Sequence, residues 1–335
     1  MEKRRMGRHG LEVTALCMGT MTFGLQVDEP TSRVILDKAC DHGLVFLDTS
    51  DAYPAGGTRE TIGATEALLG RWMKAKGNRD SLIVATKCFV PTHGGPNNWG
   101  LSRHHIMRAV EDSLRRLGTD YIDLYQSHGF DPHTPIEETL RAFEDLVTAG
   151  KVRYAGCSNY PAWRLAEALQ AAERLNVTGY ISVQPRYNIL YRDIEVELLP
   201  LCRSQGLGVI VYNPLAGGFL SGRYTPGQDF EENSRFTLGT SADMYRARYW
   251  QDAQFDAVET LKAAVEARGL DLVSVAVAWV LAQPGVSSAL IGASKPEQLD
   301  ANFAALETTL DEELVAACEA AWWSLPRRPV QEGYR

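Results

Sequence analysis

The sequence lacks any apolar run long enough to cross a membrane. Its longest apolar stretches have the length of a strand or a core helix, whereas a spanning helix needs about 20 apolar residues. No signal-peptide pattern is present. The 6 cysteines are scattered without a C-x-x-C pair, which argues against both a disulfide framework and a zinc site. We therefore expect reduced thiols, no metal, no membrane partner and a cytoplasmic location.

The sequence also lacks an excess of positive charge. It has 34 Lys and Arg against 42 Asp and Glu, a formal net charge of -8 at pH 7. Because nucleic-acid binding relies on a basic surface, we expect no nucleic-acid partner. Two nucleotide-binding motifs are missing as well: no G-x-G-x-x-G follows a predicted strand, and no G-x-x-x-x-G-K-[ST] occurs. These absences disfavour a doubly wound sheet, and the lack of Tyr-x-x-x-Lys excludes a short-chain dehydrogenase.

What the sequence does have is a regular alternation of short β-rich runs and longer amphipathic segments. Several amphipathic segments begin at Ser, Thr or Pro and end at Gly43, Gly118 or Gly150, as helices do. Eight repeats of strand and helix are typical of a (β/α)8 TIM barrel, an α/β fold. We predict one such domain over residues 1–335. Its predicted strands are residues 15–18, 45–48, 82–87, 122–128, 152–157, 181–184, 209–213 and 288–291.

Some segments depart from this alternation. Residues 2–14 predict a β-hairpin around Gly7 and Gly10, placed before the first barrel strand. Two extra helices are predicted near residues 254–268 and 312–323. Residues 214–250 form a long connection after the seventh strand. Long loops in compact domains are often lids or binding loops, so we expect extended loops at the C-terminal face of the barrel.

Polar side chains stand where several predicted strands end. Asp48 ends one strand and Tyr53 follows it, Lys87 ends another, and His128 ends a third. The C-terminal strand ends of a TIM barrel meet at one mouth, and this set of groups suits carbonyl reduction there. Tyr53 would protonate the oxygen that becomes negative as hydride arrives, and His128 would orient that oxygen. Asp48 would hold Lys87, and Lys87 would lower the pKa of Tyr53.

Each of these residues also has a plainer interpretation. Asp48 can cap the following loop, Tyr53 can pack at the rim, and His128 can be a structural histidine. Lys87 is harder to explain in this way, since unpaired buried lysines are rare. A lysine on a barrel strand is also the nucleophile of Schiff-base aldolases, which are therefore a rival enzyme class.

With these residues in place, the chain resembles the aldo-keto reductase family over nearly its whole length. The segments that carry the resemblance, in family order, are GTMTFG, FLDTSDAYPAGGTRETIG, LIVATKC, DLYQSHGFDP, GKVRYAGCSNY, VQPRYNILYRD, VYNPLAGGFLSGRY and LIGASKPEQLDANFAAL. They are similar to those of the longer, mainly microbial members, a group that includes voltage-gated potassium channel beta subunits.

The resemblance implies a catalytic tetrad of Asp48, Tyr53, Lys87 and His128, with Tyr53 as the general acid. It also implies NADPH as cofactor, with NADH bound more weakly, and Tyr212 stacked on the nicotinamide. The residues that match cofactor-binding positions of the family are Gly19, Thr20, Met21, Asp48, Ser158, Asn159, Gln184, Tyr212, Asn213, Leu215, Gly217, Leu220, Gly292, Ser294, Lys295, Gln298 and Asn302.

Departures from the family pattern concern the phosphate and the substrate. Gln298 stands where many relatives carry arginine, and Ala301 where they carry glutamate. Gly129 stands where relatives usually carry a bulky residue, which predicts an open pocket for a small-molecule carbonyl substrate. The predicted pocket residues are Met21, Phe23, Tyr53, Trp99, His128 and Gly129. An NADPH-binding, redox-sensing regulatory subunit with slow turnover is the alternative function, and a homo-oligomer is compatible with either.

Overall fold

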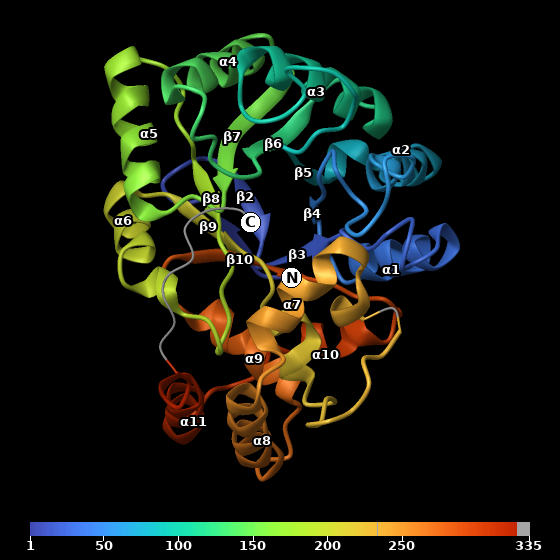
Figure 1. Ribbon diagram of the computed structural model, residues 1–335, viewed down its shortest axis with the longest axis vertical. Helices are drawn as coiled ribbons and strands as arrows, with labels where there is room; N and C mark the ends of the chain where they lie inside the picture. The colour runs from blue at the N-terminus through green and yellow to red at the C-terminus, as the bar shows by residue number, and fades with distance from the viewer. Residues whose placement is uncertain (233, 327–335) are drawn as a thin grey trace.

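Eight parallel strands close into a barrel (Figure 1). The structure, a computed structural model, describes residues 1–232 and 234–326, so residue 233 and residues 327–335 lie outside the described part. Around the barrel the strands follow the order β10-β3-β4-β5-β6-β7-β8-β9, which confirms the predicted TIM barrel. The strands are β3 (Leu16–Gly19), β4 (Phe46–Asp48), β5 (Ile83–Cys88), β6 (Ile122–Ser127), β7 (Val152–Ser158), β8 (Ser182–Gln184), β9 (Gly208–Val211) and β10 (Val286–Ile291).

Helices surround the outside of the barrel (Figure 1). Those that alternate with the strands are α1 (Glu29–Asp41), α2 (Ala64–Lys76), α3 (Arg103–Leu117), α4 (Ile136–Thr148), α5 (Ala162–Leu175), α6 (Leu198–Gln205), α9 (Leu272–Ala282) and α10 (Gln298–Ala304). Asp28 and Ser102 cap α1 and α3 by accepting from backbone N–H groups, and Gly118 ends α3 with a left-handed backbone. Within the described residues, none of the helices combines the length and the apolarity needed to cross a membrane.

The predicted N-terminal hairpin is confirmed and closes one end of the barrel. Its strands β1 (Lys3–Arg5) and β2 (Glu12–Thr14) pair antiparallel, and Met6 between them packs against apolar residues of the barrel interior. At Gly7 the φ angle is +61°, and an added Cβ would lie 2.2 Å from the carbonyl oxygen of Gly206. Only glycine fits there. Because Gly206 comes just before β9, the hairpin covers the end at which the strands begin.

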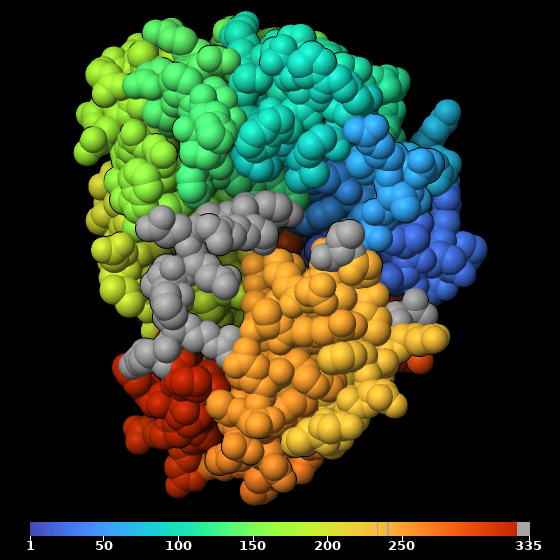
Figure 2. Space-filling model, in the orientation of Figure 1, coloured from blue at the N-terminus to red at the C-terminus, as the bar shows by residue number. Residues whose placement is uncertain are grey.

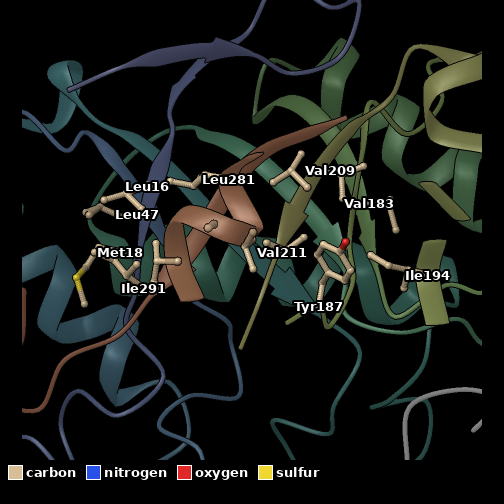
Figure 3. Packing of buried hydrophobic residues seen from close by; sticks show 14 of the residues in the cluster. Leu16, Met18, Leu47, Val183, Tyr187, Ile194, Val209, Val211, Leu281 and Ile291 are labelled. Carbon is tan, nitrogen blue, oxygen red and sulfur yellow. The ribbon is translucent and has the colours of Figure 1, made fainter. Parts of the chain in front are cut away.

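The main hydrophobic core lies between the barrel and the helices. Side chains that alternate along the strands, among them Met18, Leu47 and Ile291, point outward into it (Figure 3). Parallel pairing sets Met18 beside both Leu47 and Ile291. Burial of each such side chain stabilises the fold by roughly 1.5–3 kcal/mol. Intervening residues such as Phe46 and Ala85 point inward and form a second, smaller apolar cluster inside the barrel.

The connection after β9 contains more structure than predicted. It holds η3 (Ala216–Ser221), η4 (Arg235–Thr237), η5 (Gly239–Ser241) and α7 (Ala242–Tyr249). α7 was not predicted because its sequence ADMYRARY has no clear apolar stripe. The yellow-to-orange segment that includes it covers much of the lower part of the face in Figure 2. The two extra helices that were predicted are α8 (Asp252–Glu266) and α11 (Glu312–Trp323), and short 3-10 turns occur at η1 (Arg79–Ser81) and η2 (Asp193–Glu195).

Candidate active site

The alternation of side chains along the strands places Asp48 and Lys87 inside the barrel. Phe46 and Ala85 belong to the small apolar cluster of the barrel interior. Asp48 and Lys87 each stand two residues further along the same strands, so they share the inward direction one layer nearer the mouth. Both side chains are buried. The interior therefore changes from apolar to charged at the C-terminal ends of β4 and β5.

The carboxylate of Asp48 is the centre of a buried hydrogen-bond network. Lys87 Nζ lies 2.5 Å from Asp48 Oδ1 and also donates to the carbonyl oxygen of Thr49 at 2.8 Å. The side-chain amides of Gln126 and Gln184 donate to Asp48 Oδ2 at 3.1 and 2.8 Å. A buried ion pair needs this kind of additional hydrogen bonding to offset its desolvation. The network fixes the position of the ammonium group.

Tyr53 lies within reach of both Lys87 and His128. Lys87 Nζ is 5.1 Å from the centroid of the Tyr53 ring, and the ring of His128 meets that of Tyr53 edge-on at 5.9 Å. Burial raises the pKa of Tyr53 well above its usual value near 10, and the charge of Asp48 raises it further. The sequence predicted a pKa lowered by Lys87. In the structure, burial and the charge of Asp48 outweigh the opposing charge of Arg235, so the pKa is raised and the phenol stays protonated.

His128 is buried beside this group and is neutral near pH 7. Burial lowers the pKa of its imidazole well below 6.5, and the positive charge of Lys87 lowers it further. His128 Nδ1 lies 3.2 Å from Ser50 Oγ, and the backbone carbonyl of His128 accepts from Asn159 Nδ2 at 2.9 Å. The structure thus brings the predicted carboxylate, phenol, amine and imidazole together at one mouth.

Four of the predicted cofactor residues form a chain of hydrogen bonds next to His128. Tyr212 OH donates to Asn159 Oδ1 at 2.8 Å, and Asn159 Nδ2 donates to Ser158 Oγ at 3.0 Å. Ser158 Oγ in turn donates to the carbonyl oxygen of Gln184 at 2.8 Å. Asn159 adopts a left-handed backbone with φ 60°, which orients its amide along this chain.

The turn after β9 brings further predicted cofactor residues to the mouth. Asn213 has φ 66°, and its Oδ1 accepts from the backbone N–H of Gly217 at 2.5 Å. Gly217 has φ 72°, and an added Cβ would lie 2.9 Å from the ring of Tyr245. Glycine is therefore required both for the backbone and for the space. Leu220 is fully buried and Leu215 half-buried, and both pack in the main core.

The segment after β10 forms a turn whose amides are already satisfied. Gln298 Oε1 accepts from the backbone N–H groups of Ser294 and Lys295 at 2.7 and 3.3 Å, and from Ser294 Oγ at 3.2 Å. Asn302 Nδ2 donates to the carbonyl oxygen of Gln298 at 2.6 Å, and Asn302 Oδ1 is buried without a hydrogen-bond partner within the described chain. An anion at this turn would displace the Gln298 amide.

The remaining predicted site residues differ in their surroundings. Thr20 Oγ1 donates to the carbonyl oxygen of Asp48 at 2.9 Å, and the carbonyl of Met21 accepts from Ala55 N at 2.9 Å. An added Cβ on Gly19 would lie 3.3 Å from Ile291 O. The other members were predicted to line the substrate pocket or the cofactor path: Phe23 is fully buried in the main core, Trp99 is 46% exposed, Gly129 is buried and Gly292 is exposed.

Sequence reasoning missed Gln126 and Ser50. Gln126 stands two residues after Leu124, an interior residue of the barrel, so the same alternation that places Lys87 could have identified it. Ser50 lies in the loop after β4, where no periodicity applies.

Among the described residues, no group of His, Cys, Asp or Glu is arranged to hold a metal ion.

Arg235 from η4 reaches across to the end of β10. One of its terminal nitrogens, Nη2, lies 3.9 Å from the position that a Cβ on Gly292 would occupy. The other, Nη1, is buried and has no hydrogen-bond partner in residues 1–232 and 234–326. A buried guanidinium nitrogen without an acceptor is costly, which indicates a site for an anionic group.

Comparison with known proteins gives consistent matches. The model of the aldo/keto reductase family matches residues 15–322. The chain is 38% identical over 320 residues to an uncharacterized oxidoreductase, YrpG, of Bacillus subtilis (strain 168), with 94% of each chain covered. It is 37% identical over 339 residues to a probable voltage-gated potassium channel subunit beta of Oryza sativa subsp. japonica, with 100% of each covered. A putative aryl-alcohol dehydrogenase of Schizosaccharomyces pombe (strain 972 / ATCC 24843) is 32% identical over 352 residues, 96% of this chain and 95% of the relative.

Proposed function

The chain belongs to the aldo/keto reductase family of oxidoreductases, and we propose that it uses NADPH to reduce aldehydes or ketones to alcohols. The observation that carries this proposal is the arrangement of Tyr53, Lys87 and His128 around one point at the barrel mouth. A panel of carbonyl compounds, scored by NADPH consumption and by alcohol formed, tests it.

In this proposal Tyr53 is the general acid. Its phenol stays protonated at neutral pH because burial raises its pKa, so a proton is available for the carbonyl oxygen. As that proton leaves, the nearby ammonium of Lys87 stabilises the phenolate that remains. Asp48 holds Lys87 in place through the 2.5 Å ion pair. Neutral His128 is placed to hydrogen-bond the carbonyl oxygen and orient it.

The residues present fit a phosphorylated dinucleotide. Among the described residues, Arg235 has a buried guanidinium nitrogen, Nη1, without a hydrogen-bond partner, which a phosphate oxygen could satisfy. Lys295 supplies an ammonium group at the turn after β10, and a phosphate could replace Gln298 Oε1 as the acceptor of the Ser294 and Lys295 N–H groups. When bound, NADPH would supply the hydride. We propose that Ser294 and Lys295 favour it over NADH, because a 2′-phosphate would gain charge-assisted hydrogen bonds there.

For the substrate we propose a broad class of aromatic or cyclic aldehydes and ketones. Trp99 exposes 46% of its surface and packs edge-on against Phe89, with ring centroids 5.5 Å apart. Apolar aromatic walls with few polar groups admit ligands of similar shape. The relative named as a putative aryl-alcohol dehydrogenase supports this substrate class.

A second function is favoured by one comparison. A relative that matches the whole chain is named as a probable potassium channel beta subunit, and a regulatory subunit that binds NADPH but turns over slowly would keep the same side chains. Turnover distinguishes the two: a reductase reduces at least one carbonyl of the panel with a kcat of about 1 per second or more, whereas a sensor binds NADPH without such turnover.

A Schiff-base aldolase is disfavoured by the contacts of Lys87. A Schiff base requires a free amine that can reach a substrate carbonyl. Lys87 Nζ is engaged by both Asp48 Oδ1 and the carbonyl oxygen of Thr49. Treatment with substrate and borohydride should therefore leave Lys87 unlabelled.

The single domain over residues 1–335, the cytoplasmic location and homo-oligomer formation stay predictions.

A further inference from the structure

Asp51 is a buried carboxyl group next to the site that the proposed reaction does not use. It is fully buried, and its Oδ1 lies 3.2 Å from Ser50 Oγ. Its Oδ2 is buried without a hydrogen-bond partner in the described part of the chain. An ionised carboxylate would be costly in such surroundings, since the contacts from the Ser50 hydroxyl and the Ala52 backbone replace only part of its hydration.

The guanidinium of Arg116, whose charge acts on Asp51, is hydrogen-bonded to another carboxylate. Arg116 Nε donates to Glu66 Oε2 at 2.7 Å, and Thr86 Oγ1 donates to Glu66 Oε1 at 2.6 Å. Burial raises the pKa of Asp51 well above its usual value, Glu66 raises it further, and Arg116 only partly opposes them. Arg116 pairs with Glu66, so Asp51 has no counter-charge in hydrogen-bond contact among the described residues.

Two further titratable groups near Asp51, Cys88 and Tyr125, are neutral. Burial raises the pKa of the Cys88 thiol and of the Tyr125 phenol, and the charge of Asp51 would raise both further. The backbone N–H of Asp51 donates to the carbonyl oxygen of Lys87, at 3.2 Å, so the Asp51 backbone is fixed to β5. Asp51 therefore carries a proton at neutral pH, in a fixed position.

The hydroxyl of Ser50 links this proton to His128. Ser50 Oγ lies 3.2 Å from each of three groups: the backbone N–H of Ala52, Asp51 Oδ1 and His128 Nδ1. A hydroxyl donates one hydrogen bond and accepts two. The N–H of Ala52 can only donate. Protonated Asp51 also donates, through Oδ1, because its Oδ2 has no acceptor among the described residues. Ser50 then has one hydrogen left, and His128 Nδ1 is its acceptor.

We propose that Asp51 is a positioning residue that acts through Ser50 to place the ring proton of His128 on Nε2. With Nδ1 accepting from Ser50, Nε2 is the donating nitrogen of the neutral imidazole. An ionised Asp51 would reverse the direction of these hydrogen bonds. Ser50 would donate to the carboxylate, and His128 Nδ1 would carry the proton and donate to Ser50. The use of the Nε2–H group to orient a carbonyl oxygen rests on the proposed function, whereas the tautomer itself does not.

Nitrogen NMR of the full-length protein labelled with 15N-histidine tests the proposal directly. Long-range 1H–15N correlations distinguish a protonated Nε2 from a protonated Nδ1, and the His128 signal is identified by its loss in His128→Gln. We expect one neutral tautomer with the proton on Nε2 between about pH 6.5 and 8. A protonated Nδ1, or an imidazolium in this range, would overturn the proposal whether or not the protein reduces any carbonyl.

Two variants separate positioning from structural support. Asp51→Asn keeps a donor toward Ser50, so we expect the Nε2–H tautomer and a kcat within about 3-fold of the wild type. Ser50→Ala removes the donor to His128 Nδ1, which should shift the Nδ1 resonance and reduce kcat by about 10-fold, the equivalent of one hydrogen bond. Ser288→Ala removes a buried hydroxyl that donates to the carbonyl of Thr14 and should change neither. An unchanged Nδ1 resonance in Ser50→Ala, or a switched tautomer in Asp51→Asn, contradicts the proposal.

Discussion

Lys87 Nζ lies 2.5 Å from Asp48 Oδ1, and both side chains are buried where β4 and β5 end. Gln126 and Gln184 complete the hydrogen bonding of the carboxylate, so the pair is satisfied although little water reaches it. A buried ion pair adds little to stability compared with an apolar pair, but the loss of one partner leaves an uncompensated charge. Substitution of either residue therefore tests whether the buried charge of one depends on the charge of the other.

Lys87→Met should lower the free energy of unfolding by about 3–5 kcal/mol, because it leaves Asp48 buried without its counter-charge. The double variant Asp48→Leu with Lys87→Met should recover most of this loss while remaining inactive. Urea denaturation measures both. Lys38→Met breaks a partly exposed pair with Asp300 and serves as the control, with an expected loss of about 0–1 kcal/mol. A Lys87→Met protein as stable as the control would show that Asp48 does not depend on this ammonium.

The reduction rate should be nearly independent of pH from about 7 to 9. Tyr53 must be protonated to act as the acid, and its pKa is raised well above 10, so the acid form persists through this range. His128 stays neutral because its pKa is lowered well below 6.5. Alcohol oxidation needs the phenolate and should become faster as the pH rises. Steady-state kcat/KM in both directions measures this, and a fall in reduction centred below about pH 9 would assign Tyr53 a different role.

His105 should make the protein less stable as the pH falls. It is 1% exposed, and burial lowers its pKa to about 4, with the charge of His93 adding to the effect. The unfolded chain binds the proton near pH 6.5, so stability is lost between about pH 6.5 and 4. In this window the free energy of unfolding should fall with pH less steeply in His105→Gln than in the wild type. The two slopes should differ by about 1.4 kcal/mol per pH unit. Parallel slopes in urea denaturation would show that His105 titrates normally.

NADPH should bind more tightly than NADH, and Lys295 should carry much of the difference. Lys295→Met removes one charge-assisted contact to the 2′-phosphate, so the affinity ratio should narrow by about 10-fold or more. The affinity for NADH should stay unchanged, which serves as the internal control. Fluorescence titration measures both constants. Equal wild-type affinities for the two cofactors would mean that Gln298 keeps the Ser294 and Lys295 amides from the phosphate.

The sequence predicted the barrel and the proximity of Asp48, Tyr53, Lys87 and His128 at its mouth, whereas the roles of these four residues stay predictions. Strand alternation predicted all eight barrel strands, and the position of Lys87 in an apolar strand predicted a buried partner, which is Asp48. Contacts between loops could not be predicted from the sequence. The roles of Ser50 and Arg235 depend on how separate loops approach each other, and no local pattern encodes that. The pKa of Tyr53 was predicted in the wrong direction because the extent of burial is a property of the whole fold.

Tyr53→Phe tests the central claim most directly. The variant removes only the phenol oxygen, so the ring contacts with Lys87 and His128 remain. With the best carbonyl of the panel, we expect kcat to fall by about 10²–10⁴-fold while NADPH binds with nearly the wild-type affinity. Tyr121→Phe, which removes a phenol bonded to Asp80 on the surface, is the control and should keep full activity. If Tyr53→Phe reduces the carbonyl at a rate close to that of the wild type, Tyr53 is not the general acid and the proposed reaction mechanism is wrong.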